Sequence, residues 1–164
     1  MDSILVELFK HNTWANLRLI DACAGLAGEH LDAAVPGTFG CIRDTLTHLV
    51  AAQGRYLSLL TGEPQANPLR RGDGFSGFAD LRERALRTSE ELAAVAARAE
   101  PGRMVLVDWQ GQQEPVNSST LLIQAINHAT EHRAHVATIM GSRGIEPPEM
   151  DGWAYGEATS SSTG

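Results

Sequence analysis

Four separate segments of this chain repeat apolar residues every three or four positions, and each ends shortly before a glycine or a proline-glycine pair. They run from about Ser3 to Ala24, from Cys41 to Leu60 and from Phe78 to Ala99. The fourth starts after Ser118 and Ser119, which are candidates for its N-cap, and runs to about Ser142. This spacing places the apolar side chains on one face of a helix. Because such a face must be buried against another element, the pattern predicts an all-α fold, a four-helix bundle.

The stretches between these segments refine the prediction. Residues 104–109 and 114–116 have the pattern of two short extended runs around a glycine-containing turn, which predicts a small β-hairpin before the last helix. The connections 25–40 and 61–76 are too long for a simple up-and-down bundle, so we expect one or more of them to cross an end of the bundle.

The composition narrows the class of protein. With 164 residues, 43% of them hydrophobic, the chain can fill one core. We therefore expect one domain over residues 1–156, followed by a disordered tail of small polar residues at 157–164. The net charge of −7 opposes binding to nucleic acid or to anionic membranes. No membrane span, secretion signal or cysteine pair motif is visible, so we expect a cytoplasmic protein.

Three histidines share the apolar face of the last predicted helix. At 100° per residue, His128, His132 and His135 fall within about 60° of one another, on the stripe that holds Leu121 and Val136. Burying a polar ring without a partner costs on the order of 1–3 kcal/mol, and a shared cation would explain three such rings. His128 and His132 are four residues apart and can therefore reach one metal ion.

A histidine pair at this spacing is also common among surface or hydrogen-bonded residues, so a metal site needs a third ligand. His48 lies beside the apolar face of the second predicted helix, with small neighbours that leave room for an ion. We therefore predict that His48, His128 and His132 hold one divalent metal ion per chain. Imidazole suits zinc, our first choice, and nickel, our second, but also copper and iron.

Two asparagines, Asn12 and Asn16, lie within the apolar face of the first predicted helix. Buried amides need partners. They either form hydrogen bonds to a neighbouring helix or, together with Arg133, line a pocket or orient the metal ligands.

Trp14 lies on the polar side of the same helix. This position predicts either a contact between two subunits, which we prefer, or cover by a C-terminal segment that contains Trp153 and Tyr155. His11 has no evident partner and is predicted to be solvated.

Residues 10–26 (KHNTWANLRLIDACAGL), 37–62 (GTFGCIRDTLTHLVAAQGRYLSLLTG) and 126–144 (INHATEHRAHVATIMGSRG) resemble the DinB/YfiT-like family of damage-inducible helical-bundle proteins. The most specific part of the resemblance is a histidine in the second helix combined with N-H-x-x-x-H-R in the fourth. The resemblance implies a four-helix bundle of non-simple topology that is usually dimeric. It also implies a divalent metal held by three histidines, which correspond here to His48, His128 and His132.

The family often has H-R-G-Q in the fourth helix, whereas this chain has His132-Arg133-Ala134-His135. His135 therefore replaces the usual glutamine and becomes a candidate for an additional ligand, or for a general acid or base. Characterised relatives include mycothiol-dependent maleylpyruvate isomerase and bacillithiol S-transferases. The resemblance thus implies a metal-dependent enzyme that activates a low-molecular-weight thiol for attack on a small-molecule substrate.

Two other functions are open at this stage. In a hydrolase, the same metal would hold hydroxide. In a stress or binding protein, the metal would stabilise the bundle and nothing would turn over. Guanidinium groups that could hold a substrate carboxylate belong to Arg55, Arg133 and the adjacent pair Arg70 and Arg71.

Overall fold

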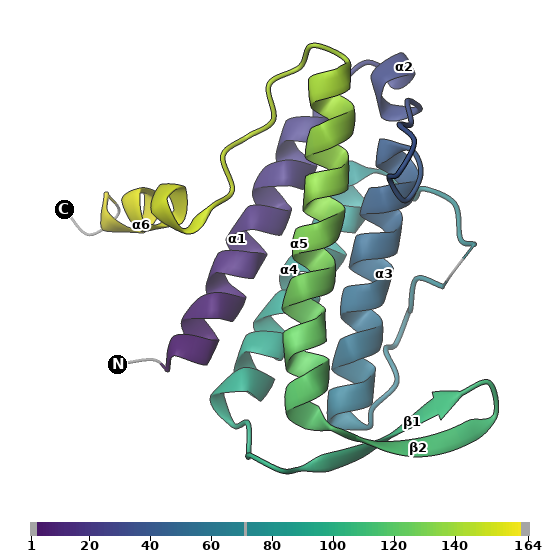
Figure 1. The fold of residues 1–164 in the computed structure, drawn as a ribbon, viewed down its shortest axis with the longest axis vertical. Coiled ribbons are helices and arrows are strands. Elements are labelled where there is room, and N and C mark those ends of the chain that lie inside the picture. Colours follow the sequence, from purple (N-terminus) through teal and green to yellow (C-terminus); the bar gives the residue numbers. More distant parts are fainter. Residues whose placement is uncertain (1–2, 71, 162–164) are drawn as a thin grey trace.

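The computed structural model describes residues 3–70 and 72–161 and has four long helices lying side by side (Figure 1). These are α1 (Ile4–Ala24), α3 (Ile42–Thr61), α4 (Phe78–Ala97) and α5 (Ser118–Ser142). The remaining elements are two short helices and a two-stranded antiparallel hairpin: α2 (Gly28–Leu31), α6 (Gly152–Ser160), β1 (Met104–Trp109) and β2 (Gln112–Asn117). The predicted all-α class with a small hairpin before the fourth long helix is confirmed. None of the helices in the described part of the chain is long and apolar enough to cross a lipid bilayer.

The helices do not follow a simple up-and-down order. In Figure 1, α3 and α4 run in the same direction, and the connection of residues 62–77 returns along the length of α3 before α4 begins. Helix α1 packs against α4, and α3 packs against both α4 and α5. The long connection is therefore a crossover that runs beside the bundle, and it places its own residues next to the exposed side of α3.

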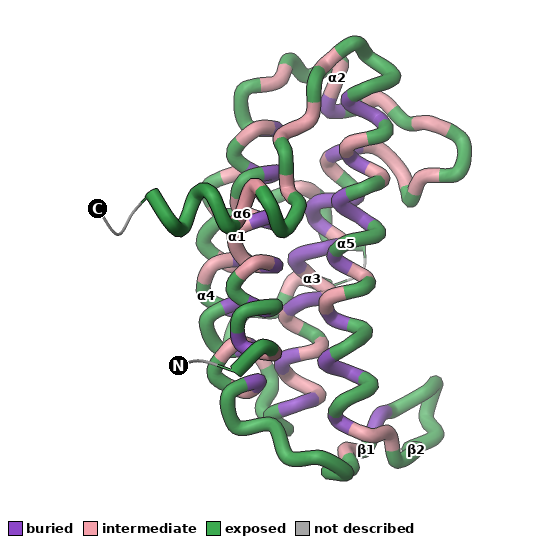
Figure 2. The backbone as a smooth tube through the Cα atoms, turned by 60° about the vertical axis from the view of Figure 1, so that its left-hand side comes forward, coloured by how far each residue is buried: buried purple, intermediate pink, exposed green. Residues whose placement is uncertain are grey.

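The core consists of two apolar clusters separated by a layer of polar side chains. One cluster contains Leu19, Leu46 and Ile139, and the other contains Phe9 and Leu57. Figure 2 shows buried residues along the inner faces of the long helices. Burial of each such side chain stabilises the fold by about 1.5–3 kcal/mol. Between the two clusters, each long helix contributes to what we call the polar layer: Asn12, Asn16, Gln53, Thr88, Ser89, His132 and Arg133.

The hairpin closes one end of the bundle. Its turn is made by Gln110 and Gly111, whose φ angles of 56° and 90° are the positive values that a tight two-residue hairpin turn requires. Val107 on β1 is completely buried in the same apolar cluster as Phe9. Val105 and Val116 are partly buried against the same cluster, so apolar side chains of both strands anchor the hairpin, which leads directly into α5.

The C-terminal segment differs from the prediction. Helix α6 continues to Ser160, whereas we expected disorder from residue 157; residues 162–164 of the expected tail lie outside the described residues. The helix begins because the Asp151 carboxylate accepts hydrogen bonds from the N–H groups of Trp153 and Ala154, both at 2.9 Å. The prediction of disorder rested on the small polar residues at 157–164 and did not consider Asp151 as an N-cap.

The same segment covers part of α1. The Tyr155 ring lies edge-on to Trp14, with ring centroids 5.6 Å apart. His11, which we expected to be solvated, has its Nε2 atom 2.9 Å from the carbonyl oxygen of Met150. The structure thus gives Trp14 an intramolecular cover, the second of the two alternatives, and the predicted dimer stays a prediction.

Candidate metal centre

The three predicted ligands come from two helices that lie next to each other. His48 is half-buried on α3, His128 is half-buried on α5, and His132, one turn further along α5, is 5% exposed. Helix α5 is capped at its N-terminus by Asn117, whose side-chain oxygen accepts from the N–H of Ser119 at 3.0 Å. Because α3 and α5 pack together, the histidines from both helices point toward the same region.

The geometry of the three rings fits a single ion. The Nε2 atom of His128 lies 3.0 Å from that of His48 and 3.1 Å from that of His132. One candidate ligand atom from each residue lies within 4.8 Å of the other two. With a zinc–nitrogen bond of about 2.0–2.1 Å, two nitrogens on the same ion are at most about 4.2 Å apart. The two separations that involve His128 satisfy this limit, and the ligand atoms of His48 and His132 lie within 4.8 Å of each other. The predicted grouping of His48, His128 and His132 is therefore present.

Hydrogen bonding among the rings explains this arrangement less well. The Nε2 atom of His128 takes part in both short contacts. In a neutral imidazole, that atom carries either one proton or one lone pair, so it cannot donate to one neighbour and accept from the other. A cation accepts a lone pair from each of the three rings and removes the conflict. The donor set therefore fits a divalent metal ion.

The protonation state of the rings is also the one that metal binding requires. Burial, together with the neighbouring His48, lowers the pKa of His128 to about 4. Burial and the neighbouring histidines likewise lower the pKa of His132 to about 4. Both rings are therefore neutral at pH 7 and keep a lone pair for a metal, because metal ions compete with protons for imidazole nitrogen.

A fourth aromatic ring at this centre was missed from the sequence. Phe39, in the connection between α2 and α3, stacks on His48 with centroids 4.1 Å apart and lies edge-on to His132 at 5.1 Å. Phe39 is itself 45% exposed, and its stacked ring covers one face of the His48 imidazole. No helical or strand periodicity marks residue 39, which lies in the long connection 25–40.

The second predicted group, Asn12, Asn16 and Arg133, lies inside the bundle. The Arg133 guanidinium donates at 2.6 Å to the side-chain oxygens of both asparagines. Asn16 in turn donates to Gln53 at 3.1 Å, and Gln53 donates to Thr88 and to two further acceptors on α4. The asparagines therefore form hydrogen bonds to neighbouring helices, the first of our two alternatives.

This arrangement corrects one expectation about Arg133. Its side chain is 4% exposed, bonds to amide oxygens and does not line the cavity described below, so it is not placed to hold a substrate carboxylate. Burial lowers the pKa of Arg133 to about 10, and the group still carries its charge at neutral pH. Because Arg133 follows His132 directly on α5, the polar layer fixes the helix that carries two of the three candidate ligands.

His135 lies beside the three histidines but is not one of the grouped ligands. Its ring centroid is 5.3 Å from that of His132, and the two rings meet edge-on. Its Nδ1 atom is buried and has no hydrogen-bond partner in the described part of the chain. A role for His135 in proton transfer stays a prediction.

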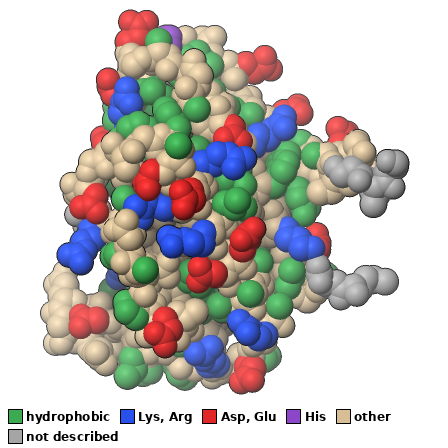
Figure 3. Space-filling view, turned by 180° about the vertical axis from the view of Figure 1, so that it is seen from behind, with side chains coloured by type: hydrophobic (Ala, Val, Ile, Leu, Met, Phe, Trp, Pro, Cys, Tyr) green, Lys and Arg blue, Asp and Glu red, His purple; other side chains and the backbone are tan. Residues whose placement is uncertain are grey.

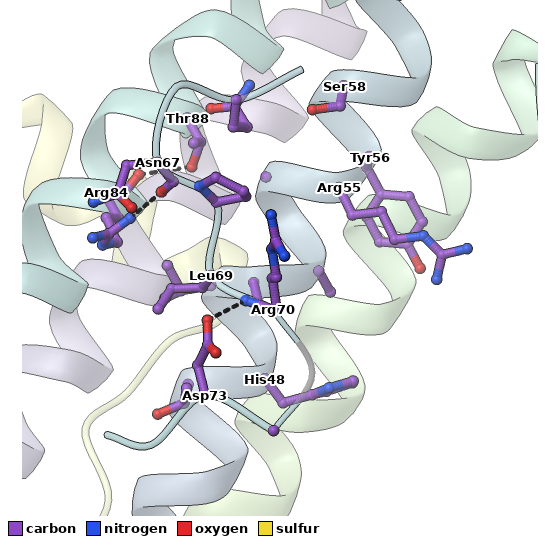
Figure 4. Close-up of a pocket in the computed structure, with 18 of the residues that line it drawn as sticks. His48, Arg55, Tyr56, Ser58, Asn67, Leu69, Arg70, Asp73, Arg84 and Thr88 are labelled. Carbon is purple, nitrogen blue, oxygen red and sulfur yellow. Dashed lines mark hydrogen bonds between the residues drawn. The ribbon is translucent and has the colours of Figure 1, made fainter. Parts of the chain in front are cut away.

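The three-histidine centre opens onto a large cavity. A space of about 1040 Å³ lies between α3, the crossover of residues 62–77 and α4, and His48, His128 and Phe39 are among the residues that line it. Figure 4 shows His48, Arg55 and Tyr56 from α3 and Arg70 from the crossover around this space. The cavity is large enough for a small molecule in addition to an ion. Arg71, the other member of the predicted pair, lies outside the described residues.

Comparison with known proteins agrees with this architecture. The DinB family profile matches residues 1–163 of the chain. Among solved structures, a DinB-like protein from Bacillus cereus is similar, with a TM-score of 0.68 and 15% sequence identity over 88% of this chain and 94% of that one. The search of curated proteins gave no match. The structural likeness shows the fold, and the profile match extends over nearly the whole chain.

Proposed function

Because this chain belongs to the DinB family and brings three imidazole nitrogens together beside a cavity, we propose that it is a metal-dependent enzyme of the thiol S-transferase type. In this proposal, His48, His128 and His132 hold one divalent ion, with zinc as our first choice and nickel as our second. The observation that carries the proposal is the convergence of the three Nε2 atoms beside the cavity, with two of the three residues, His48 and His128, lining it. A purely structural site has no need of an adjacent open space.

The donor set supports an open coordination site. Structural zinc sites have four protein ligands, whereas catalytic sites have three and leave a position for water or substrate. The grouped ligands among the described residues are three histidines. A metal in such a site lowers the pKa of a bound thiol, so that the sulfur is a thiolate near pH 7.

The surrounding residues suit a bimolecular reaction of a thiol with an electrophile. The sulfur forms a bond to an electrophilic carbon, and the leaving group departs with the electron pair of the bond that breaks. His135 is the candidate to take the thiol proton, because its ring contacts that of His132. Phe39 covers one face of the His48 imidazole, and the cavity gives room for both reactants.

The two alternative functions, a hydrolase and a non-catalytic metal protein, differ from a thiol transferase in what the cavity would bind and in the effect of removing the metal. A hydrolase would bind an ester, amide or phosphoryl substrate in the same cavity and would need no thiol. A non-catalytic protein would lose its fold, but no reaction, when the metal is removed. The size of the cavity beside the histidines favours an enzyme over a structural metal protein.

The test begins with elemental analysis of the protein purified without an affinity tag. We expect about one zinc or nickel ion per chain, and loss of that ion in His48→Ala, His128→Ala and His132→Ala. His30→Ala is the matched control, because His30 is half-buried but lies outside the group. Full metal content in all three ligand variants would show that the site is wrong.

Activity is then measured with several simple thiols and an activated aryl chloride. Thiol-dependent turnover that disappears in His128→Ala but not in His30→Ala supports the transferase. Turnover of an ester in the absence of any thiol supports the hydrolase instead.

A further inference from the structure

The cavity beside the histidines has a local excess of positive charge, although the chain as a whole has a net charge of −7. Its lining contains two acidic residues and twice as many arginines: Asp44, Asp73, Arg55, Arg70, Arg84 and Arg87. On the rear face, which Figure 3 shows, acidic and basic side chains are intermingled.

The arginines that line the cavity differ in whether a carboxylate already pairs with them. Arg84 is held by the Asp80 carboxylate at 2.7 Å and also donates to the backbone oxygen of Asn67, so it fastens the crossover to α4. Asp73 accepts the backbone N–H of Arg70 at 2.7 Å, and this bond shapes the loop.

Three guanidinium groups are left for a ligand. Among residues 3–70 and 72–161, the side chains of Arg55, Arg70 and Arg87 have no carboxylate within ion-pair distance. They come from three separate elements, α3, the crossover and α4, and they line the same cavity. Charges of one sign in a concave site reinforce one another and attract a ligand of the opposite sign.

The spacing along α3 sets a length for that ligand. His48 and Arg55 are seven residues apart, which is two turns, so they lie on one face of the helix about 10 Å apart along its axis. Ala51 and Ala52 lie between them, and Leu69 of the crossover also lines this stretch. The wall between the histidine and the arginine is thus apolar and has small side chains.

We propose that the cavity binds a small molecule that carries a carboxylate roughly 10 Å from the group that reacts at the histidines. The carboxylate pairs with Arg55, whose planar guanidinium can donate two parallel hydrogen bonds to it, and Arg70 and Arg87 add positive charge to the same cavity. An apolar segment of the molecule lies along Ala51, Ala52 and Leu69. This inference rests on the proposed function for the reacting group and adds the chemical class of the substrate.

The experiment compares two thiols of equal length that differ in one end group: 6-mercaptohexanoate and 6-mercaptohexan-1-ol. Each is titrated into the zinc-loaded full-length protein by isothermal titration calorimetry. We expect the acid to bind about tenfold more tightly than the alcohol, because hydrogen bonds to a charged group are worth more than neutral ones. Raising the salt concentration weakens binding of the acid only.

Arginine variants locate the anion site. Arg55→Gln, Arg70→Gln and Arg87→Gln should each weaken binding of the acid about three- to tenfold and leave the alcohol unchanged. Arg143→Gln is the control, because Arg143 is exposed at the end of α5 and does not line the cavity. Each variant is checked for an unchanged melting temperature before titration.

The outcomes separate this inference from the proposed function. Equal affinity for the two thiols, unaffected by the three variants, overturns the carboxylate site and leaves thiol binding standing. Adipate, which has carboxylates and no thiol, is titrated in parallel. Binding of adipate that depends on the arginines, with no added affinity from a thiol, supports the carboxylate site and contradicts the thiol transferase. No binding of any probe at millimolar concentration overturns both.

Discussion

Replacement of Asn16 by alanine should destabilise the protein more than replacement of Asn12, although both asparagines bond to the same buried arginine. Asn12 is 3% exposed and Asn16 is 1% exposed, so both side chains are almost completely removed from water in the folded protein. Asn12→Ala removes one acceptor of the Arg133 guanidinium. Asn16→Ala removes the other acceptor and also leaves the side-chain oxygen of Gln53 without its donor at 3.1 Å.

The magnitudes follow from these contacts. A hydrogen bond to a charged group contributes about 1.5–3 kcal/mol, and a buried oxygen left without a donor costs about 1–3 kcal/mol. We therefore expect Asn12→Ala to lower the free energy of unfolding by about 2 kcal/mol and Asn16→Ala to lower it by about 4 kcal/mol. Gln53 should keep its three bonds to α4 in both variants.

The measurement is urea denaturation at pH 7, followed by far-ultraviolet circular dichroism, on metal-free protein so that metal affinity does not enter. Arg82→Ala serves as a surface control. Arg82 makes a two-point ion pair with Asp21 across an exposed face, and such pairs contribute about 1 kcal/mol or less. A cost for Asn16→Ala no larger than that for Asn12→Ala would refute the reasoning about the polar layer.

Four further predictions concern the metal centre and the C-terminal helix. Phe39→Ala should weaken zinc binding about tenfold or less, because an aromatic pair contributes about 0.5–1.5 kcal/mol; competition with a chromophoric chelator measures this, and unchanged affinity contradicts a supporting role for the ring. The free energy of unfolding of the metal-free protein should fall as the pH is lowered from about 6.5 to about 4, because burial holds the pKa of His128 and His132 near 4 while the unfolded rings take up protons from pH 6.5 downward. Urea midpoints that stay constant over this range contradict it. Zinc at one hundred times its dissociation constant should add about 2.7 kcal/mol of stability, which a thermal melt with and without chelator detects. Asp151→Ala should destabilise α6 by about 1 kcal/mol and increase hydrogen exchange there; exchange equal to that of the unchanged protein contradicts the cap.

The fold was predictable because the long helices obey local rules. Each of the four has an apolar face and ends near a glycine, and the structure places them close to the predicted bounds. Helix α4 ends at Ala97, two residues earlier than predicted, and α5 is capped by Asn117. Helices α2 and α6 were not predicted because they are short, and short helices depend on caps and contacts with distant residues more than on periodicity.

All three candidate ligands could be predicted from the sequence. The spacing of His128 and His132 places two rings together by local geometry, and His48 was predicted as the third ligand from its position beside the apolar face of another helix. The structure places the Nε2 atom of His48 3.0 Å from that of His128. Phe39 could not be predicted, because a loop residue has no periodicity that says what it faces. That Asn12 and Asn16 need partners could be predicted, but their bonds to Arg133 could not, because these depend on how α1 packs against α5.

The most direct test of the metal centre is X-ray absorption at the zinc edge of the zinc-loaded protein. We predict one ion per chain whose spectrum fits three imidazole nitrogens at about 2.0–2.1 Å. In any His48→Ala protein that retains metal, the number of imidazole nitrogens should fall to two. A spectrum without imidazole scattering, or one that is identical in His48→Ala, would contradict the assignment of His48, His128 and His132 as the ligands.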